Sequence, residues 1–354
     1  MLTKIKHVFV TILLRLLQHD RIRLALAQQL SESRPQLNHL ENLQSPYFSV
    51  SNGIKKENEA SERDDVIFIT GRFRSGSTLV WNMFRQLPEV TSYYEPLNER
   101  KWFLKQNRGN NVDSTHLGVE DYWLEFDGME ELDQLYDENW TRANLYMDST
   151  SWNPKLKEYI CHLIESAQGR PVLQFNRVDF RLPWLRHHFP NAKILHVYRN
   201  PRDQWMSFLS DSCVKKEDID TSYKDYFYLH SWCQDLAPQF PFLNDNFTSH
   251  PYQRFYYLWK LSYIYGMKFS DLSTGFEDLV TNKEQTTKNI IDTFCLNTST
   301  DKMTSVIASP PLNRWKKWAD DQWFSNLEAE CERNLNLYLK AKPTTNTTDR
   351  LSEQ

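Results

Sequence analysis

Short apolar runs alternate with helical patterns along much of the chain, and this alternation predicts its fold class. Apolar runs of about four to eight residues are typical of buried strands, whereas apolar positions spaced three and four apart are typical of amphipathic helices. Strands that alternate with helices form right-handed crossovers, so we expect an α/β fold with a mostly parallel central sheet flanked by helices. The pattern predicts strands at 66–70, 90–95, 171–176 and 192–199, and helices at 77–87, 153–168, 181–189 and from Pro201.

Polar segments mark the limits of this α/β region. We interpret residues 1–64 as an N-terminal helix with a polar lead-in, 65–340 as one domain, and 341–354 as a flexible tail. The acidic, aromatic stretch near 100–150 has no clear strand pattern and is interpreted as an insertion. Two interpretations of the insertion stay open, either a cover over the active site or an ordinary solvated excursion.

The first residues raise the question of membrane attachment. An apolar run at 8–14 follows two lysines, but Arg15 ends it after seven residues, far short of the roughly 20 that span a bilayer. We therefore expect an amphipathic helix and a cytoplasmic protein. Membrane association of this helix is not favoured, and a membrane-anchored lumenal protein is the alternative.

Composition and charge narrow the classes of partner. The formal net charge of -4 gives no general attraction to nucleic acid, so any anion site must be local. The five cysteines are scattered without a C-x-x-C pair, which argues against a zinc site and a disulfide framework and favours a reducing compartment. The 12 tryptophans indicate either a large aromatic core or stacking surfaces for flat ligands.

The segment "GRFRSGST" at 71–78 follows the first strand and opens a helix, as a phosphate-binding loop does. It matches the Walker A pattern except that Ser77 stands where that pattern has lysine. Gly71 and Gly76 allow a tight backbone path, and the N-terminus of the following helix attracts an anion without a lysine. The loop therefore predicts an anion site.

The missing lysine indicates what kind of anion the loop holds. Arg72 and Arg74 supply cations from within the loop, but the charge that reaches the outer phosphates of a nucleoside triphosphate is absent. The strand at 192–199 ends in arginine, so we find no acidic Walker B residue for magnesium. The sulfuryl group carries one formal negative charge and needs no metal, so its transfer fits this loop.

The loop resembles the 5′-phosphosulfate loop of the sulfotransferases that use 3′-phosphoadenosine 5′-phosphosulfate (PAPS), in its R-S-G-[ST]-[ST] form. The resemblance implies a P-loop NTPase-like sulfotransferase fold, with the donor bound by Arg72, Arg74, Ser75, Gly76, Ser77 and Thr78. A second segment, "ILHVYRNPRDQWMS", is similar to the 3′-phosphate motif of that family. It places Arg199 at a strand end and Ser207 about two turns into the next helix, and a guanidinium with a hydroxyl suits a terminal phosphate.

Two further segments resemble donor-binding parts of the family. "GFEDLV" resembles a Y-E-x-L segment whose tyrosine lies near the adenine; Phe276 at that position keeps the ring and loses the hydroxyl. "SPPLNRWKKW" is loosely similar to a basic loop that folds over the nucleotide. This similarity makes Arg314, Lys316 and Lys317 candidates for closing the site.

Sulfuryl transfer needs a base for the acceptor proton and positive charge at the leaving oxygen. Glu95 ends the strand after the loop helix and is the candidate base, as resemblance to Golgi carbohydrate and tyrosylprotein sulfotransferases implies. A salt-bridged strand-end carboxylate is the alternative. We find no counterpart of the catalytic histidine of cytosolic sulfotransferases. Arg74, and Arg177 after another strand, are the candidate cations, with a protein-facing role for Arg177 as the alternative.

The leading hypothesis is a PAPS-dependent sulfotransferase that acts on a hydroxyl acceptor without a metal. The acceptor is favoured to be a saccharide rather than a lipid, a small molecule or a peptide tyrosine, because the tryptophan-rich insertion suits sugar rings. Alternatives are a P-loop kinase of a small metabolite and a nucleotide-binding interaction protein without turnover.

Overall fold

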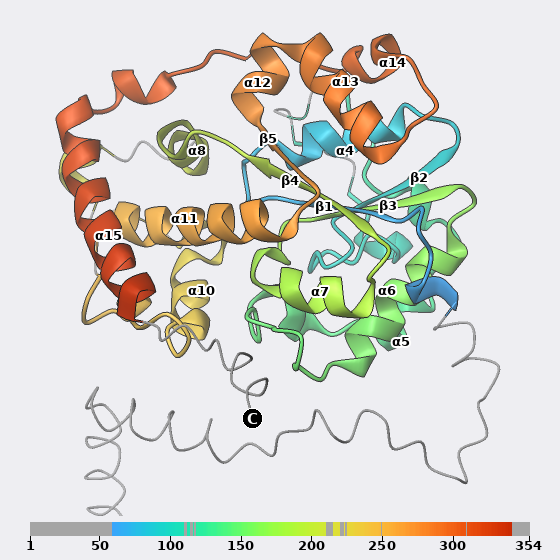
Figure 1. The fold of residues 1–354 in the computed structure, drawn as a ribbon, viewed down its shortest axis with the longest axis horizontal. Helices are drawn as coiled ribbons and strands as arrows, with labels where there is room; N and C mark the ends of the chain where they lie inside the picture. Colours follow the sequence, from blue (N-terminus) through green and yellow to red (C-terminus); the bar gives the residue numbers. More distant parts are fainter. Residues whose placement is uncertain are drawn as a thin grey trace, which may run out of the picture. The chain divides into compact units, whose positions relative to one another are not determined.

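A parallel sheet lies at the centre of the computed structural model (Figure 1), which describes residues 59–109, 112–113, 116, 118–209, 215–219, 223, 225–248, 250–308 and 310–341. In this part of the chain five strands pair in the order β2-β3-β1-β4-β5, and every pairing is parallel. The strands are β1 (Ile67–Thr70), β2 (Val90–Tyr94), β3 (Arg170–Phe175), β4 (Lys193–Tyr198) and β5 (Leu272–Gly275). The α/β prediction is confirmed.

Helices connect the strands and continue past the last one. The α-helices are α4 (Ser77–Arg85), α5 (Leu132–Leu135), α6 (Pro154–Ser166), α7 (Leu182–His188), α8 (Pro201–Phe208), α10 (Leu229–Leu236), α11 (Pro251–Phe269), α12 (Phe276–Thr281), α13 (Lys283–Phe294), α14 (Thr300–Thr304) and α15 (Asp321–Ala341). The 3₁₀ helices are η2 (Lys105–Asn107), η3 (Leu124–Phe126), η4 (Glu138–Thr141), η5 (Asp179–Arg181), η6 (Lys216–Asp218), η7 (Tyr226–Tyr228), η8 (Pro241–Leu243) and η9 (Arg314–Lys317).

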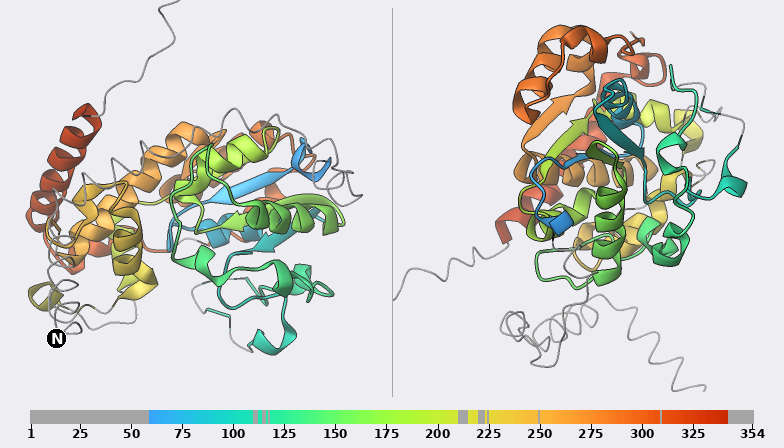
Figure 2. Two further views of the ribbon diagram at one scale, coloured as in Figure 1. Left: turned by 90° about the horizontal axis from the view of Figure 1, so that it is seen from below. Right: turned by 90° about the vertical axis from the view of Figure 1, so that its right-hand side faces the viewer.

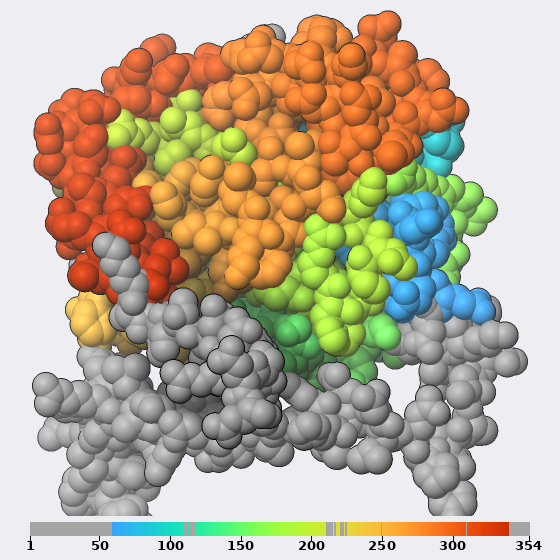
Figure 3. Space-filling view, in the orientation of Figure 1, coloured from blue at the N-terminus to red at the C-terminus, as the bar shows by residue number. Residues whose placement is uncertain are grey.

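Alternate residues of β1 pack against helices on opposite faces of the sheet. Ile67 and Ile69 belong to a core cluster with residues of α4, α13 and α14, whereas Phe68 belongs to a cluster with residues of α6 and α7. This alternation follows from the two-residue period of a strand. Figure 3 shows side chains of α11 to α14 (orange) and α7 (yellow-green) forming the surface over the sheet.

A third core cluster lies beside the sheet. Trp205 of α8, Trp232 of α10 and Phe255 of α11 pack together there with residues of α15. The views in Figure 2 place α15 (red) at the end of the described part that is far from α6. Arg202 of α8 ties this end together through Glu328 of α15, with Arg202 Nε donating to its carboxylate at 2.9 Å.

The segment between β2 and α6 contains α5 and short 3₁₀ helices, and its described residues form no strand. Its aromatic side chains are largely buried: Trp102, Tyr122 and Trp140 have exposed fractions of 5%, 5% and 3%. These rings share a core cluster with Tyr93 and Tyr94 of β2. Most of their surface is therefore used for packing rather than for stacking on a ligand.

The four predicted strands are present with ends shifted by at most a residue, and β5 was not predicted. The expected N-terminal helix lies outside the described residues. Within the described residues, no helix has both the length and the apolar character needed to cross a membrane.

Candidate active site

The chain segments that follow all five strands meet at the carboxyl edge of the sheet. A cavity of about 680 Å³ opens there, a size typical of ligand pockets. Its lining includes at least one residue from the segment after each strand. These residues are Arg74 after β1, Glu95 after β2, Arg177 after β3, Arg199 after β4 and Phe276 after β5. A parallel sheet brings distant sequence segments together in this way because all its strands end on the same side.

The loop between β1 and α4 has the backbone of an anion cradle. Gly76 precedes the helix with a φ of 98°, and no side chain caps the first turn of α4. The first N–H groups of a helix have no partner within it, and Ser77 and Thr78 at the start of α4 line the cavity, where an anion could accept from them. A Cβ atom at Gly76 would lie 2.3 Å from the ring of Phe276, so only glycine fits here.

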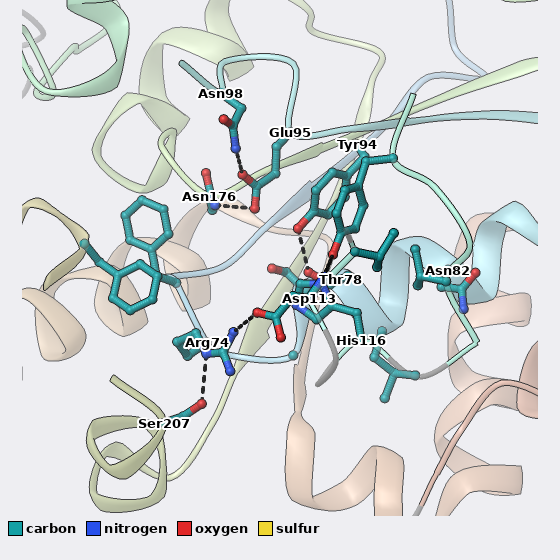
Figure 4. Close-up of a pocket in the computed structure, with 18 of the residues that line it drawn as sticks. Arg74, Thr78, Asn82, Tyr94, Glu95, Asn98, Asp113, His116, Asn176 and Ser207 are labelled. Atoms are coloured by element: carbon teal, nitrogen blue, oxygen red, sulfur yellow. Dashed lines mark hydrogen bonds and ion pairs between the residues drawn. The ribbon is translucent and has the colours of Figure 1, made fainter. Parts of the chain in front are cut away.

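Arg74 connects the loop to the helix after β4. Its Nε donates to Ser207 Oγ of α8 at 2.9 Å, and its guanidinium pairs with Asp113 at 3.0 Å (Figure 4). The backbone of Arg74 has a φ of 66°, a strained value for a residue with a side chain. The residues matched to the 5′-phosphosulfate and 3′-phosphate motifs therefore lie within hydrogen-bond distance of each other.

Arg199 is a buried cation with one unpartnered donor. It is 8% exposed, its buried Nε has no hydrogen-bond partner, and its guanidinium lies 4.6 Å from the ring centroid of Phe276. Burial lowers the pKa of Arg199, and Arg314 and Arg74 lower it further, while Asp203 and Glu277 act in the opposite direction. A buried guanidinium with an unpartnered donor fits an anionic ligand such as a phosphate.

The basic segment near the C-terminus is held over the cavity by α8. Asp203 accepts hydrogen bonds from the backbone N–H groups of Asn313, at 2.7 Å, and Trp315, at 3.4 Å. Arg314, between them, lines the cavity. Lys316 does not line it; its ammonium group lies 5.6 Å from the ring centroid of Trp315.

Arg72 and Ser75 lie behind the loop instead of facing the cavity. Arg72 is 3% exposed and its guanidinium lies 4.3 Å from the ring centroid of Trp232, against the aromatic core. Burial lowers the pKa of Arg72 to about 10. Ser75 is 1% exposed, and its N–H donates to the Arg72 carbonyl at 3.0 Å within the turn. Neither residue lines the cavity, although we expected both to bind the donor.

Glu95 follows β2 with a φ of 41°, and its carboxylate faces the cavity. Asn98 Nδ2 and Asn176 Nδ2 each donate to it at 2.5 Å, and Arg177 contacts it at 3.3 Å. Figure 4 shows the two amides on either side of the carboxylate. The carboxylate is therefore held in one orientation while part of it still borders the cavity.

Arg177 is almost completely buried, and its two terminal nitrogens contact different carboxylates. One pairs with Glu95, and the other pairs with Glu99 at 2.5 Å. Burial acts to lower the pKa of Arg177, but Glu95 and Glu99 together raise it above its ordinary value. Burial acts to raise the pKa of Glu99, but Arg177 and the hydroxyl of Tyr228 lower it overall.

The loop helix and β2 are also joined directly. Gln174 of β3 donates to Ser77 Oγ at 3.1 Å and accepts from the Glu95 N–H at 3.2 Å. Thr78 Oγ1 and the Tyr94 hydroxyl lie 3.2 Å apart. These contacts set the position of Glu95 relative to the start of α4, where the anion would bind.

Three cavity residues come from segments for which the sequence contained no recognisable signal. Asp113 and His116 lie in the insertion, and Tyr228 ends η7. His116 Nδ1 lies 2.5 Å from the Tyr122 hydroxyl, and burial lowers the pKa of His116. His116 therefore lines the cavity, although no sequence pattern indicated that it would lie there. Asn98, Asn176 and Glu99 were also missed, although they adjoin Glu95 and Arg177 in the sequence.

Comparison with known proteins identifies the class of this enzyme. The model of the sulfotransferase family matches residues 65–300, more than half of the 354-residue chain. The chain belongs to this family and is thus an enzyme that transfers sulfuryl groups; the kinase and non-catalytic alternatives are not retained. Within the described residues, no group of three or more His, Cys, Asp or Glu side chains is arranged to hold a metal ion.

Several solved structures are similar to this chain at low identity. Sulfotransferase STF9 from Mycobacterium avium has 13% identity and a TM-score of 0.41, with 84% of this chain and 88% of that chain covered. A sulfotransferase from Alicyclobacillus acidocaldarius has 14% identity and a TM-score of 0.36, with 79% and 97% covered. The sulfotransferase domain of the Synechococcus PCC 7002 olefin synthase has 15% identity and a TM-score of 0.35, with 75% and 86% covered. No curated protein matches the sequence significantly.

Proposed function

We propose that this sulfotransferase transfers the sulfuryl group of PAPS to a hydroxyl acceptor, with Glu95 as the general base. The observation that carries this proposal is that the Glu95 carboxylate borders the same cavity as the Arg74 guanidinium and the N-terminus of α4. A base and an anion cradle are the two elements that the reaction needs.

The donor fits the part of the cavity that is lined by the loop before α4 and by Arg199. The start of α4 and Arg74 would hold the 5′-phosphosulfate, and Arg199 with Ser207 would hold the 3′-phosphate. Arg314 would add positive charge from the segment held by Asp203. The buried and unpartnered Nε of Arg199 supports this assignment, since a phosphate oxygen would satisfy it.

The reaction is an in-line displacement at sulfur. The acceptor oxygen forms a bond to sulfur while the bond between sulfur and the 5′-phosphate oxygen breaks. The acceptor proton passes to Glu95, and 3′-phosphoadenosine 5′-phosphate leaves with the charge stabilised by Arg74 and the loop N–H groups. This step needs no metal, because the charge that develops on the leaving phosphate faces a cation and a helix N-terminus.

We further propose a saccharide as the acceptor class. The part of the cavity beyond Glu95 is lined by polar side chains, among them Asn98, Glu99, Arg100 and Tyr228. Such donors and acceptors can bind several hydroxyl groups at once. The aromatic rings of the insertion contribute less than expected to this proposal, because they are largely buried.

An acceptor screen tests the proposal. The protein is incubated with PAPS labelled at the sulfuryl group and with sets of saccharides, phenols, hydrophobic alcohols and tyrosine peptides. We expect label in a saccharide, and we expect Glu95→Gln to lower kcat by about 10²- to 10⁴-fold, the usual effect of losing a general base. Exposed Glu158 of α6 provides the control Glu158→Gln, which should keep full activity.

Measuring the affinity of Glu95→Gln for 3′-phosphoadenosine 5′-phosphate distinguishes loss of the general base from loss of the folded structure. Nucleotide affinity should stay close to that of the unchanged protein, because Glu95 lies outside the anion cradle. Full transfer by Glu95→Gln would remove Glu95 as the base, and label in a phenol or peptide alone would overturn the saccharide assignment.

A further inference from the structure

One buried guanidinium is shared by two carboxylates beside the proposed base. Arg177 has a side-chain exposed fraction of 2%, and its NH1 and NH2 nitrogens point to Glu95 and Glu99 respectively. The contact to Glu99 is 2.5 Å, whereas the contact to Glu95 is 3.3 Å. Arg177 is therefore paired more closely with Glu99 than with Glu95.

Glu99 is held in this position from its other side. The Tyr228 hydroxyl donates to Glu99 Oε1 at 2.7 Å, while Glu99 Oε2 accepts from Arg177. The backbone of Tyr228 has a φ of 59°, which is strained for a bulky residue. Strain that aims a hydroxyl at one carboxylate oxygen is typical of a functional site rather than of a solvated surface.

Pairing with an arginine affects how well a carboxylate can act as a base. A carboxylate that holds the whole charge of a neighbouring arginine has a pKa well below its ordinary value and is a poor base. A buried carboxylate with no cation has a raised pKa. The single charge of Arg177 is divided between the Glu95 and Glu99 carboxylates.

We propose that Glu99 is a positioning residue for sulfuryl transfer, which draws Arg177 away from Glu95 and keeps the Glu95 carboxylate basic enough to accept the acceptor proton. This inference rests on the proposed role of Glu95. Glu99 acts through Arg177 and also through its own negative charge. Both effects favour protonation of Glu95, so the loss of Glu99 removes both and should make Glu95 harder to protonate.

Other titratable groups near Glu95 do not share this behaviour. Burial raises the pKa of Tyr122 to about 12 and that of Tyr94 well above its ordinary value, so both stay neutral at pH 3–9. The charges of Arg74 and Asp113 pair with each other. His116 titrates below its ordinary range, because burial lowers its pKa. The titratable and charged groups around Glu95 are therefore Arg177, Glu99, His116, Tyr94, Tyr122, Arg74 and Asp113.

Direct titration of Glu95 tests the proposal without any acceptor. Protein labelled with ¹³C at the glutamate carboxyl carbons is followed by NMR between pH 3 and 9, and the Glu95 signal is assigned by its absence in Glu95→Gln. In Glu99→Gln we expect the pKa of Glu95 to fall by roughly one pH unit or more, the usual effect of a cation at this distance. An unchanged or higher pKa would overturn the proposal.

Three comparisons make the result specific. Glu99→Asp keeps the charge and should restore most of the Glu95 pKa, which a merely structural role would not do. Glu158→Gln, on the exposed face of α6, should leave it unchanged. Glu99→Gln in a His116→Asn background should give the same fall, and a fall that disappears there would assign the effect to His116 instead.

A reciprocal measurement covers the case in which Glu99→Gln does not fold. Coupling between two titrating groups is mutual, but the proposal makes Glu99 the group that titrates first, while Glu95 is still protonated and neutral, so Glu95→Gln should leave the pKa of Glu99 nearly unchanged. A clear fall in the pKa of Glu99 in Glu95→Gln would mean that Glu95 titrates first, and would contradict the inference. The transfer assay with Glu95→Gln tests the proposed base separately, so failure of either idea can be recognised.

Discussion

Single side chains at the carboxyl edge of the sheet differ in how fully their charges are paired. Arg74 pairs with Asp113, and Arg177 pairs with two carboxylates. Arg199 lies next to two other arginines, and its Nε has no partner. Each of these residues follows a strand, but only their three-dimensional surroundings determine which of them has charge left for a ligand.

Arg199 should be the residue whose loss most weakens donor binding. We expect Arg199→Met to raise the Kd for 3′-phosphoadenosine 5′-phosphate by about 10- to 100-fold, because a hydrogen bond to a charged group contributes about 1.5–3 kcal/mol. Isothermal titration calorimetry measures this Kd. The control is Arg142→Met, an exposed residue that pairs with Glu138 outside the cavity. Equal Kd values for the two variants would contradict the assignment of Arg199.

At the scale of elements, the junction of β1 and α4 depends on glycine for two separate reasons. Gly76 has a φ of 98°, which residues with a Cβ rarely adopt, and it lies against the ring of Phe276. The close approach of Phe276 also supports Arg199, which lies over the same ring. The loop, the start of α12 and the end of β4 are therefore packed as one unit.

Comparing alanine substitutions at Gly76 and at Gly128 of the insertion separates strain from crowding at this junction. Gly128 also has a positive φ, 80°, but nothing lies within 4 Å of a Cβ placed there. We expect Gly128→Ala to lower the free energy of unfolding by about 1–2 kcal/mol, from backbone strain alone. Gly76→Ala should lower it by at least about 1 kcal/mol more and should weaken binding of 3′-phosphoadenosine 5′-phosphate. Urea unfolding measures the difference, and equal values would show that Phe276 moves aside without loss.

The stability of the whole folded protein depends in part on a buried histidine, at which the sheet and the long helix α11 meet. His196 of β4 is 1% exposed and contacts Ser273 of β5, and a Cβ at Gly266 of α11 would lie 2.2 Å from its ring. Burial lowers the pKa of His196 to about 4, from an ordinary value of 6.5. The folded protein therefore holds His196 neutral, whereas the unfolded chain takes up a proton below pH 6.5.

This difference predicts how stability depends on pH. The stabilising effect of a neutral His196 is complete above pH 6.5 and is lost as the pH falls toward 4, by up to about 3 kcal/mol. Urea unfolding at several pH values measures the slope. His196→Gln should flatten it, whereas His187→Gln, at an exposed site of α7, should not. The same slope in His196→Gln as in the unchanged protein would contradict the prediction.

The sequence predicted the four strands with clear apolar runs and missed β5. The β5 segment, "LSTG", contains a single large apolar residue, and its pairing with β4 defines it as a strand. Most of the predicted site residues line the cavity, namely Glu95, Arg74, Gly76, Ser77, Thr78, Arg177, Arg199, Ser207, Phe276 and Arg314, and Arg72, Ser75 and Lys316 do not. A motif specifies which residues lie on a loop, but the side of the loop on which each side chain lies depends on the neighbouring core, as the contact between Arg72 and Trp232 shows.

The alternation of strands and helices, the glycine loop before α4 and the order of the two phosphate motifs can all be predicted from the sequence, because they depend on local periodicity and backbone freedom. Which charges share the cavity depends on how the strands and the insertion fold together. Asp113 and His116 of the insertion reach Arg74 and Glu95 through folding alone, and Glu99 shares Arg177 with Glu95 because the neighbouring strands β2 and β3 end side by side. Electrostatic partners depend on distance in space, which spacing along a chain does not reveal.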